Sequence, residues 1–296
     1  MNYKRFFYCG FIITAVVLVF GNCNTASNPE QLDYSKTPIF FVHGHGMRSK
    51  CWKPIMAYLV KNGYPKKYLM AIELHPNDGS NIYAAERQIF PAIEEFLRNI
   101  NKSLHGKFPN MSRKTKVDMI SHSMGALSAR WYTAKVRPDR VRLWISLTGA
   151  NHGTNVLCGF SGQGAEDLCP AYARSIEESY IQYQLNGAPD LADVDETPYG
   201  VGKDASGFFS VAPDSDRKIV YISVRTSPDK WIKPECSPIL DGTGGIKIPV
   251  PENVQARETS PGNILMTNGI GHDAILICPD TMQLIKAILS QANSHL

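Results

Sequence analysis

The 296-residue chain has little excess charge of either sign, with 31 Lys and Arg against 27 Asp and Glu and a net charge of +4. Proteins that bind nucleic acid need a larger basic excess, so we expect no nucleic-acid partner. No internal repeat or low-complexity block is present. Hydrophobic residues make up 43% and charged residues 20% of the chain, which excludes a disordered chain and a disulfide-dense miniprotein and predicts an ordinary globular domain.

Acidic residues are missing from the first 21 positions. Lys4 and Arg5 precede an apolar run over residues 6–20, which is the layout of an export signal, and the run is shorter than the ~20 residues that span a bilayer. Phe20-Gly21-Asn22-Cys23 resembles a relaxed bacterial lipoprotein box, in which the cysteine is acylated and becomes the first residue of the mature chain. We therefore predict a signal peptide over 1–22 and a membrane anchor at Cys23. Ordinary cleavage between Gly21 and Ala26, giving a secreted chain, is the alternative.

Residues 23–36 are polar and without periodicity, which predicts a flexible tether before one domain over 37–296. In that domain apolar runs of strand length alternate with helical patterns, so we predict an α/β fold with a mostly parallel sheet and helices on both faces. Residues 155–210 break the alternation and predict an insertion over one end of the sheet, which we interpret as a lid or a wall of the acyl pocket, with ordinary packing of its aromatic residues as the alternative. The expected strands are 39–42, 68–74, 117–120, 141–147, 219–224 and 263–267, and the expected helices are 52–62, 81–103, 124–136 and 280–291.

A serine follows the third expected strand in the sequence Ser121-His122-Ser123-Met124-Gly125, which leads at once into a helix. Small residues two positions before and after a serine, between a strand and a helix, are typical of a nucleophile elbow, whose tight turn projects the hydroxyl above the sheet. Ser121 stands where glycine is usual. We predict Ser123 as the nucleophile; an exposed serine at a helix N-cap is the alternative.

A glycine-rich turn ends the first expected strand, in His43-Gly44-His45-Gly46. Such a turn can aim the amide of His45 at the point that the amide of Met124 also faces, which predicts a two-donor oxyanion hole. The spacing of His43 and His45 is also common among metal ligands, but no third ligand has a matching context. We therefore expect neither a metal nor another cofactor.

A serine nucleophile needs a base, and the base needs a carboxylate that holds its tautomer. His272 lies in a glycine-flanked loop after a predicted strand and before the last helix, which is the best setting among the histidines. Asp229 directly follows the strand that ends at Val224 and is our predicted acid, with Asp241 as the alternative. The chain order Ser123, Asp229, His272 is that of the α/β hydrolases. We expect Asp118, on the strand before Ser123, to be a buried, hydrogen-bonded packing group.

Five stretches together resemble the α/β-hydrolase fold, and within it the bacterial lipases of the true-lipase and small lidless (class 2) kinds. They are PIFFVHGHG, VDMISHSMGALSARWY, LTGANHGT, TSPDKWIKP and TNGIGH, in the correct order. The segment from Cys158 to Cys169 and TNGIGH are also similar to a lipase-like extracellular polyhydroxybutyrate depolymerase. The resemblance implies hydrolysis of an ester or lipid substrate through an acyl-enzyme. A depolymerase, an acyltransferase and a catalytically silent lipoprotein that binds a lipid or host ligand are the alternatives.

Export would place the cysteines in an oxidising compartment, where pairing is expected. We predict a bridge between Cys158 and Cys169, which are close in a glycine-rich stretch. A second bridge between Cys236 and Cys278 would tie together the loops that carry Asp229 and His272. Three further residues are candidates for substrate binding, with packing roles as their alternatives: His152, Phe160 and Phe208. We expect a monomer.

Overall fold

The structure is a computed structural model that describes residues 32–170, 180–186, 196–197, 200–201, 219–240 and 247–295. The predicted signal peptide, Cys23, Phe208 and the alternative acid Asp241 lie outside these residues. Within the described part of the chain, no helix combines the length and the apolar character that crossing a membrane requires.

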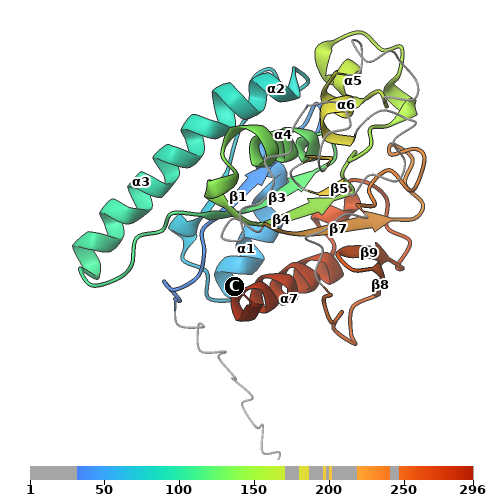
Figure 1. Cartoon of the computed structure of the whole chain (residues 1–296). Coiled ribbons are helices and arrows are strands. Elements are labelled where there is room, and N and C mark those ends of the chain that lie inside the picture. Colours follow the sequence, from blue (N-terminus) through green and yellow to red (C-terminus); the bar gives the residue numbers. More distant parts are fainter. Residues whose placement is uncertain are drawn as a thin grey trace, which may run out of the picture.

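A seven-stranded sheet with the order β2-β1-β3-β4-β7-β9-β8 forms the centre of the molecule (Figure 1). The first six strands in this order are parallel, and β8 pairs antiparallel with β9 at the edge. The predicted α/β fold with a mostly parallel sheet is therefore confirmed. The strands are β1 Ile39–Val42, β2 Leu69–Ala71, β3 Val117–His122, β4 Val141–Leu147, β7 Val220–Thr226, β8 Ala256–Ser260 and β9 Asn263–Met266.

Burial explains which strands the sequence pattern predicted. All residues of β1 and β3 are buried, and strands covered on both faces appear as continuous apolar runs. Strand β8, with the sequence ARETS, alternates between half-buried and exposed residues at the sheet edge. It has no apolar run, so the pattern did not indicate it.

Helices cover both faces of the sheet (Figure 1). Helices α3 and α4 pack on one face, where Phe40, Met119 and Trp144 belong to the same apolar cluster as their buried residues. Helices α1 and α7 pack on the other, against Phe41 and Ile145. The helices are α1 Lys53–Lys61, α2 Asn81–Tyr83, α3 Phe90–Lys107, α4 Gly125–Trp131, α5 Gln163–Leu168, α6 Tyr180–Asn186 and α7 Pro279–His295; π-helical turns follow α2 and α4 over Ala84–Ile89 and Tyr132–Val136.

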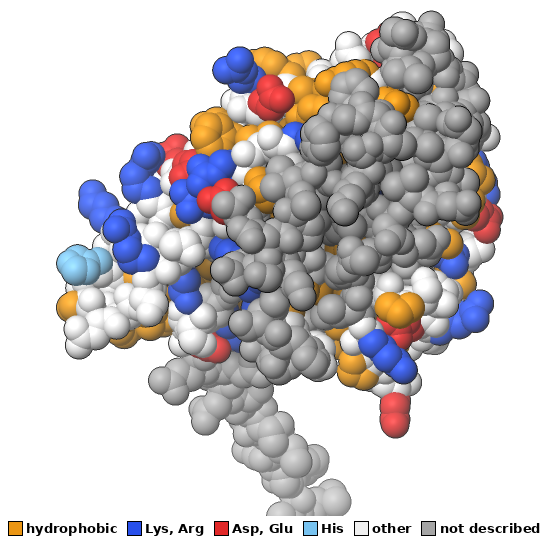
Figure 2. All heavy atoms as spheres, viewed as in Figure 1, with side chains coloured by type: hydrophobic (Ala, Val, Ile, Leu, Met, Phe, Trp, Pro, Cys, Tyr) orange, Lys and Arg blue, Asp and Glu red, His pale blue; other side chains and the backbone are white. Residues whose placement is uncertain are grey.

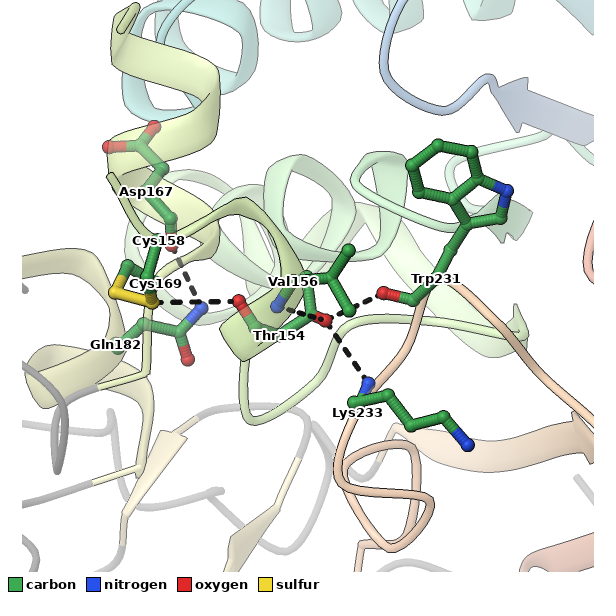
Figure 3. Close-up of a disulfide and its surroundings, with 8 residues drawn as sticks. All are labelled: Thr154, Val156, Cys158, Asp167, Cys169, Gln182, Trp231 and Lys233. Carbon is green, nitrogen blue, oxygen red and sulfur yellow. Dashed lines mark hydrogen bonds between the residues drawn. A yellow bond between two sulfur atoms is a disulfide. The ribbon is translucent and has the colours of Figure 1, made fainter. Parts of the chain in front are cut away.

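The described part of the insertion holds α5, α6 and a separate two-stranded ribbon of β5 Glu196–Thr197 and β6 Gly200–Val201. The predicted bridge between Cys158 and Cys169 is present (Figure 3). The predicted bridge between Cys236 and Cys278 is wrong, because both are free thiols. Cys236 is exposed, whereas Cys278 is buried just before α7, where its Sγ accepts a hydrogen bond from Asn268 Nδ2.

The last residues of the predicted tether pack against the domain. The Tyr34 ring lies 6.0 Å from that of Tyr68 and 5.1 Å from that of Phe108, and Asp33 donates its backbone N–H to the carbonyl of Gly63. The folded part therefore includes residues 32–36. Asp118 is fully buried and accepts hydrogen bonds from the guanidinium of Arg142, so it has the packing role expected of it.

Candidate active site

Ser123 lies in the sharp turn between β3 and α4, and its backbone has a φ of +54°. L-residues rarely adopt this left-handed conformation, and the surrounding structure must hold it. The Ser123 N–H donates to the carbonyl of Leu147 at the end of the neighbouring strand β4, and the Ser123 carbonyl accepts from the N–H of Ala126 in α4. The local geometry is thus that of a nucleophile elbow.

Two glycines let the elbow and the turn after β1 approach each other. A Cβ atom on Gly44 would lie 2.8 Å from Ser123 Cβ, and a Cβ atom on Gly125 would lie 2.4 Å from the carbonyl oxygen of His43. Both distances are shorter than a van der Waals contact, so larger residues would push the two turns apart. Ser121, at the usual glycine position, is accommodated because its buried hydroxyl accepts a hydrogen bond from Trp144 Nε1 at 2.8 Å.

The two amides expected to form the oxyanion hole belong to these turns. Met124 N–H lies at the start of α4, and His45 follows the close approach at Gly44. Neither amide donates a hydrogen bond to a protein acceptor within the described residues. Both are therefore available to an oxygen atom of a ligand.

His272 and Asp229 are brought together from separate loops, with 2.8 Å between Nδ1 and Oδ2. Both side chains are nearly fully buried. The other carboxylate oxygen of Asp229 accepts the N–H groups of Trp231 at 2.8 Å and Ile232 at 3.0 Å. Burial by itself would raise the pKa of Asp229, but the hydrogen bond and charge of His272 and the two amides hold the pKa below its ordinary value. A carboxylate that stays ionised fixes the His272 tautomer with the proton on Nδ1.

Ser123 and His272 line one cavity of about 170 Å³. No hydrogen bond joins the Ser123 hydroxyl to the His272 ring among the described contacts, a looseness that is common in ligand-free sites. Leu157, Leu168 and Ile232 give the cavity an apolar wall. The full lining is His45, Met47, His122, Ser123, Thr154, Leu157, Leu168, Trp231, Ile232, His272 and Asp273.

Thr154 joins the insertion to the loop that carries Asp229 (Figure 3). Its hydroxyl donates to the carbonyl of Trp231 at 2.6 Å and accepts from the N–H of Lys233 at 3.1 Å. The bridge between Cys158 and Cys169 directly follows the wall residue Leu157 and encloses the wall residue Leu168. Sequence reasoning missed these wall residues, although Trp231 and Ile232 stand beside the predicted acid.

Of the three candidate substrate-binding residues, the two that the structure describes are absent from the lining of this cavity. His152 Nδ1 lies 2.7 Å from the carbonyl oxygen of Ser237, so this histidine has a structural role. Phe160 is 62% exposed and is absent from the lining. Leu157, three residues earlier in the chain, lines the cavity instead. The third candidate, Phe208, lies outside the described residues.

A fully buried histidine, His122, directly precedes Ser123 and contacts the loop that carries His272. Its Nε2 lies 3.2 Å from the backbone carbonyl oxygen of His272, so this nitrogen carries the proton and donates. Burial, followed by the neighbouring His272, lowers the pKa of His122 to about 3. Thr148, whose φ is +44°, places its hydroxyl 3.5 Å from the same carbonyl oxygen. The sequence by itself gives no sign of this support for the loop that carries His272.

His122, His272 and Asp273 form a cluster whose potential ligand atoms lie within 4.8 Å of one another. An imidazole nitrogen binds a metal ion only when it carries a lone pair rather than a proton. The protonated Nε2 of His122 faces a carbonyl oxygen, and Nδ1 of His272 faces Asp229. These hydrogen bonds therefore occupy Nε2 of His122 and Nδ1 of His272, and in each ring only the other nitrogen carries a lone pair.

Comparison with known proteins gives one family and a number of similar solved structures. The sequence profile described as palmitoyl protein thioesterase matches residues 38–192. A lipase from Bacillus licheniformis in its mature form is 18% identical, with 67% of this chain and 68% of that chain covered and a TM-score of 0.37. Lipase B from Aspergillus fumigatus is 14% identical over 88% of this chain and 55% of that one, with a TM-score of 0.49. An α/β hydrolase from a sediment metagenome of the Mar Chica lagoon, Morocco, is 14% identical over 89% and 94%, with a TM-score of 0.40.

The neutral, buried state of His122 predicts an acid-sensitive stability. Between pH 6.5, near the ordinary histidine pKa, and pH about 3, the unfolded chain binds a proton at this residue that the folded chain does not. The free energy of unfolding should therefore fall as the pH falls through this window, by up to ~1.4 kcal/mol per pH unit from this group. His122→Gln, which keeps an N–H donor, should reduce the slope of stability against pH in urea denaturation. The exposed-site control His105→Gln should not, and equal slopes in all three proteins would contradict the assignment.

Proposed function

The chain belongs to the palmitoyl protein thioesterase family of α/β hydrolases, and from this premise we propose that it is a serine hydrolase that cleaves esters or thioesters of fatty acids. The observation that carries the proposal is the pairing of His272 with Asp229 at 2.8 Å beside a serine in a left-handed elbow, in one cavity. These are the three side chains that acyl transfer to water requires.

The proposed reaction has two steps. Ser123 Oγ attacks the substrate carbonyl carbon while His272 Nε2 accepts its proton, and Asp229 stabilises the imidazolium. The amides of His45 and Met124 donate to the oxyanion, each contributing about 3 kcal/mol to stabilisation of the transition state. His272 then protonates the leaving alcohol or thiol, and the same residues activate a water molecule that releases the fatty acid from Ser123.

The lining of the cavity supports an acyl substrate. Leu157, Leu168 and Ile232 offer apolar contacts to the first carbon atoms of an acyl chain. The volume of about 170 Å³ is below the 300–1,000 Å³ typical of sites that enclose a whole ligand. In our proposal a long chain extends past Trp231, which is 52% exposed at the mouth. The reacting group alone is enclosed.

Loss of the nucleophile tests the mechanism. Ser123→Ala should abolish labelling by a fluorophosphonate probe and lower kcat by four orders of magnitude or more. Asp229→Asn should lower kcat by about 10⁴ because His272 loses its fixed tautomer. The exposed-serine control Ser112→Ala should keep both labelling and activity. A folded Ser123→Ala protein that is still labelled would exclude this mechanism, and an unlabelled parent protein would favour the binding lipoprotein.

A substrate series tests the acyl and leaving groups. We expect kcat/KM to rise from p-nitrophenyl acetate to p-nitrophenyl palmitate, up to about fourfold for each methylene buried against the apolar wall. A palmitoyl thioester should be cleaved at least as fast as a palmitoyl ester of an unactivated alcohol, since a thiol is the better leaving group. A preference for acetate would remove the fatty acyl assignment. Turnover confined to polyhydroxybutyrate would favour the depolymerase.

The proposed location is the cell envelope, with export through residues 1–22 and an acylated Cys23. The bridge between Cys158 and Cys169 supports an oxidising compartment. We expect exported protein to incorporate an alkyne-labelled fatty acid at Cys23 and to lose the label in Cys23→Ala but not in Cys236→Ala, which removes an exposed free thiol. Release of unlabelled protein that begins after Cys23 would contradict the anchor and support secretion.

A further inference from the structure

A cluster of cations surrounds the point where the described chain begins, and we call it the basic patch. Six residues form it: Lys36, Lys66, Lys67, Lys107, Arg113 and Lys114. They come from the segments that lead into β1, β2 and β3 and from the end of α3. Figure 2 shows Lys and Arg side chains gathered along the α3 side of the molecule.

Aromatic rings hold the cations of the basic patch together. Lys67 Nζ lies 5.0 Å from the centre of the Tyr34 ring, and Lys114 Nζ lies 5.9 Å from that of Tyr68. Tyr34 also contacts Phe108, which is 38% exposed. Desolvation and the nearby charge of Lys107 lower the pKa of Lys67, which indicates that these like charges are close.

Among the described residues, no ion pair joins a patch cation to a carboxylate, although the charges of Lys36 and Lys114 lower the pKa of Asp33. None of the six has an acidic oxygen within 4.0 Å in the described structure. Asp33 is the acidic residue of the segment that enters the fold here, and its carboxylate accepts from Ser35. Six cations and this carboxylate give +5, against +4 for the whole chain. The charges named here are therefore predominantly positive.

The neighbouring arginines differ in this respect. Arg137 and Arg140 pair with Glu94 and Asp139, and Arg142 pairs with the buried Asp118. Pairing is thus the rule a short distance away, along the start of β4. In the basic patch, by contrast, the described cations form no ion pair with a carboxylate.

A hollow of about 470 Å³ lies beside the patch. It is lined by Arg98, Asn101, Lys102, His105 and Arg113, among others, and Asn101 is hydrogen-bonded to the backbone of Lys114. Cationic side chains around a hollow of this size suit a phosphate head group with part of its glycerol.

The patch and the cavity of the candidate active site lie at opposite ends of the parallel strands. The patch residues precede the strands, whereas Ser123 and His45 follow β3 and β1. Strand β3 has six residues. At a rise of ~3.3 Å per residue, its two ends are about 20 Å apart. A surface that contacts the patch at one end of the strands therefore leaves the cavity at the other end open.

We propose that the basic patch binds an anionic lipid surface and orients the protein with its active-site cavity facing away from that membrane. The sequence before Leu32 supports this occupant, because it contains the apolar run 6–20 and Cys23 and leads directly into the patch. Nine residues from Cys23 to Leu32 can span at most about 30 Å. Surface cations attract anionic head groups, and tyrosine and phenylalanine suit the interface. The substrate would then arrive from the side opposite to the anchoring membrane.

Lysine footprinting of the exported, full chain tests this orientation. The protein is acetylated with a water-soluble reagent on vesicles of phosphatidylcholine alone or mixed with phosphatidylglycerol, and each lysine is quantified by mass spectrometry. We expect phosphatidylglycerol to slow the labelling of the exposed Lys66 and Lys107 severalfold and to leave Lys53 and Lys247, also exposed, unchanged. About 1 M salt should remove the protection by screening the charges.

A matched pair of variants identifies the cations responsible. In Lys102→Gln/Arg113→Gln, the phosphatidylglycerol fraction that half-suppresses labelling of Lys66 and Lys107 should rise severalfold; in the control Lys247→Gln/Arg257→Gln it should not. Equal labelling on both vesicle types, or protection of Lys53 and Lys247 instead, would overturn the proposal. Protection by a single-stranded oligonucleotide but not by vesicles would assign the patch to nucleic acid. None of these readouts depends on hydrolysis, so the proposed function can fail independently.

Discussion

The close approach of two turns, made possible by Gly44 and Gly125, is the constraint on which the site depends. A Cβ atom on either glycine would collide with the facing turn. The turns touch where Ser123 has a φ of +54°, and His45 lines the same cavity as this serine. The backbone strain at Ser123 is offset by hydrogen bonds to β4 and α4 and by the packing of fully buried strands on both sides.

The loop that carries His272 is held by a second set of contacts, which are polar and buried. His122 and Thr148 both reach the carbonyl of His272, one from β3 and one from the end of β4. Asp229 holds the ring of the same residue from the loop after β7. Neighbouring parallel strands thus each supply one contact at their carboxyl ends. A neutral donor at His122 suits this place, since a cation there would repel the imidazolium that the proposed reaction forms on His272.

The insertion adds a wall to this site. In our proposal, the basic patch at the opposite end of the strands orients the protein on a membrane. Thr154 and the bridge between Cys158 and Cys169 hold Leu157 and Leu168 over the cavity. The five lysines and Arg113 of the basic patch lie before the strands and at the end of α3. The parallel sheet separates the two by its own length, so that in our proposals chemistry and membrane contact use different ends of the same strands.

Sequence alone determined the parallel sheet, because its strands are continuous apolar runs bounded by turns, and it indicated Ser123, Asp229 and His272, because hydrolases of this fold place such residues directly after strands. It also indicated the bridge between Cys158 and Cys169, which are near neighbours in the chain. Tertiary structure decided the rest. The edge strand β8 has no apolar signal, the wall residues Leu157 and Leu168 look like any core leucine, and Cys236 and Cys278 stand close to the site residues in sequence but differ in burial. His122 and the basic patch depend on segments distant in sequence, and only the folded sheet sets the distances between them.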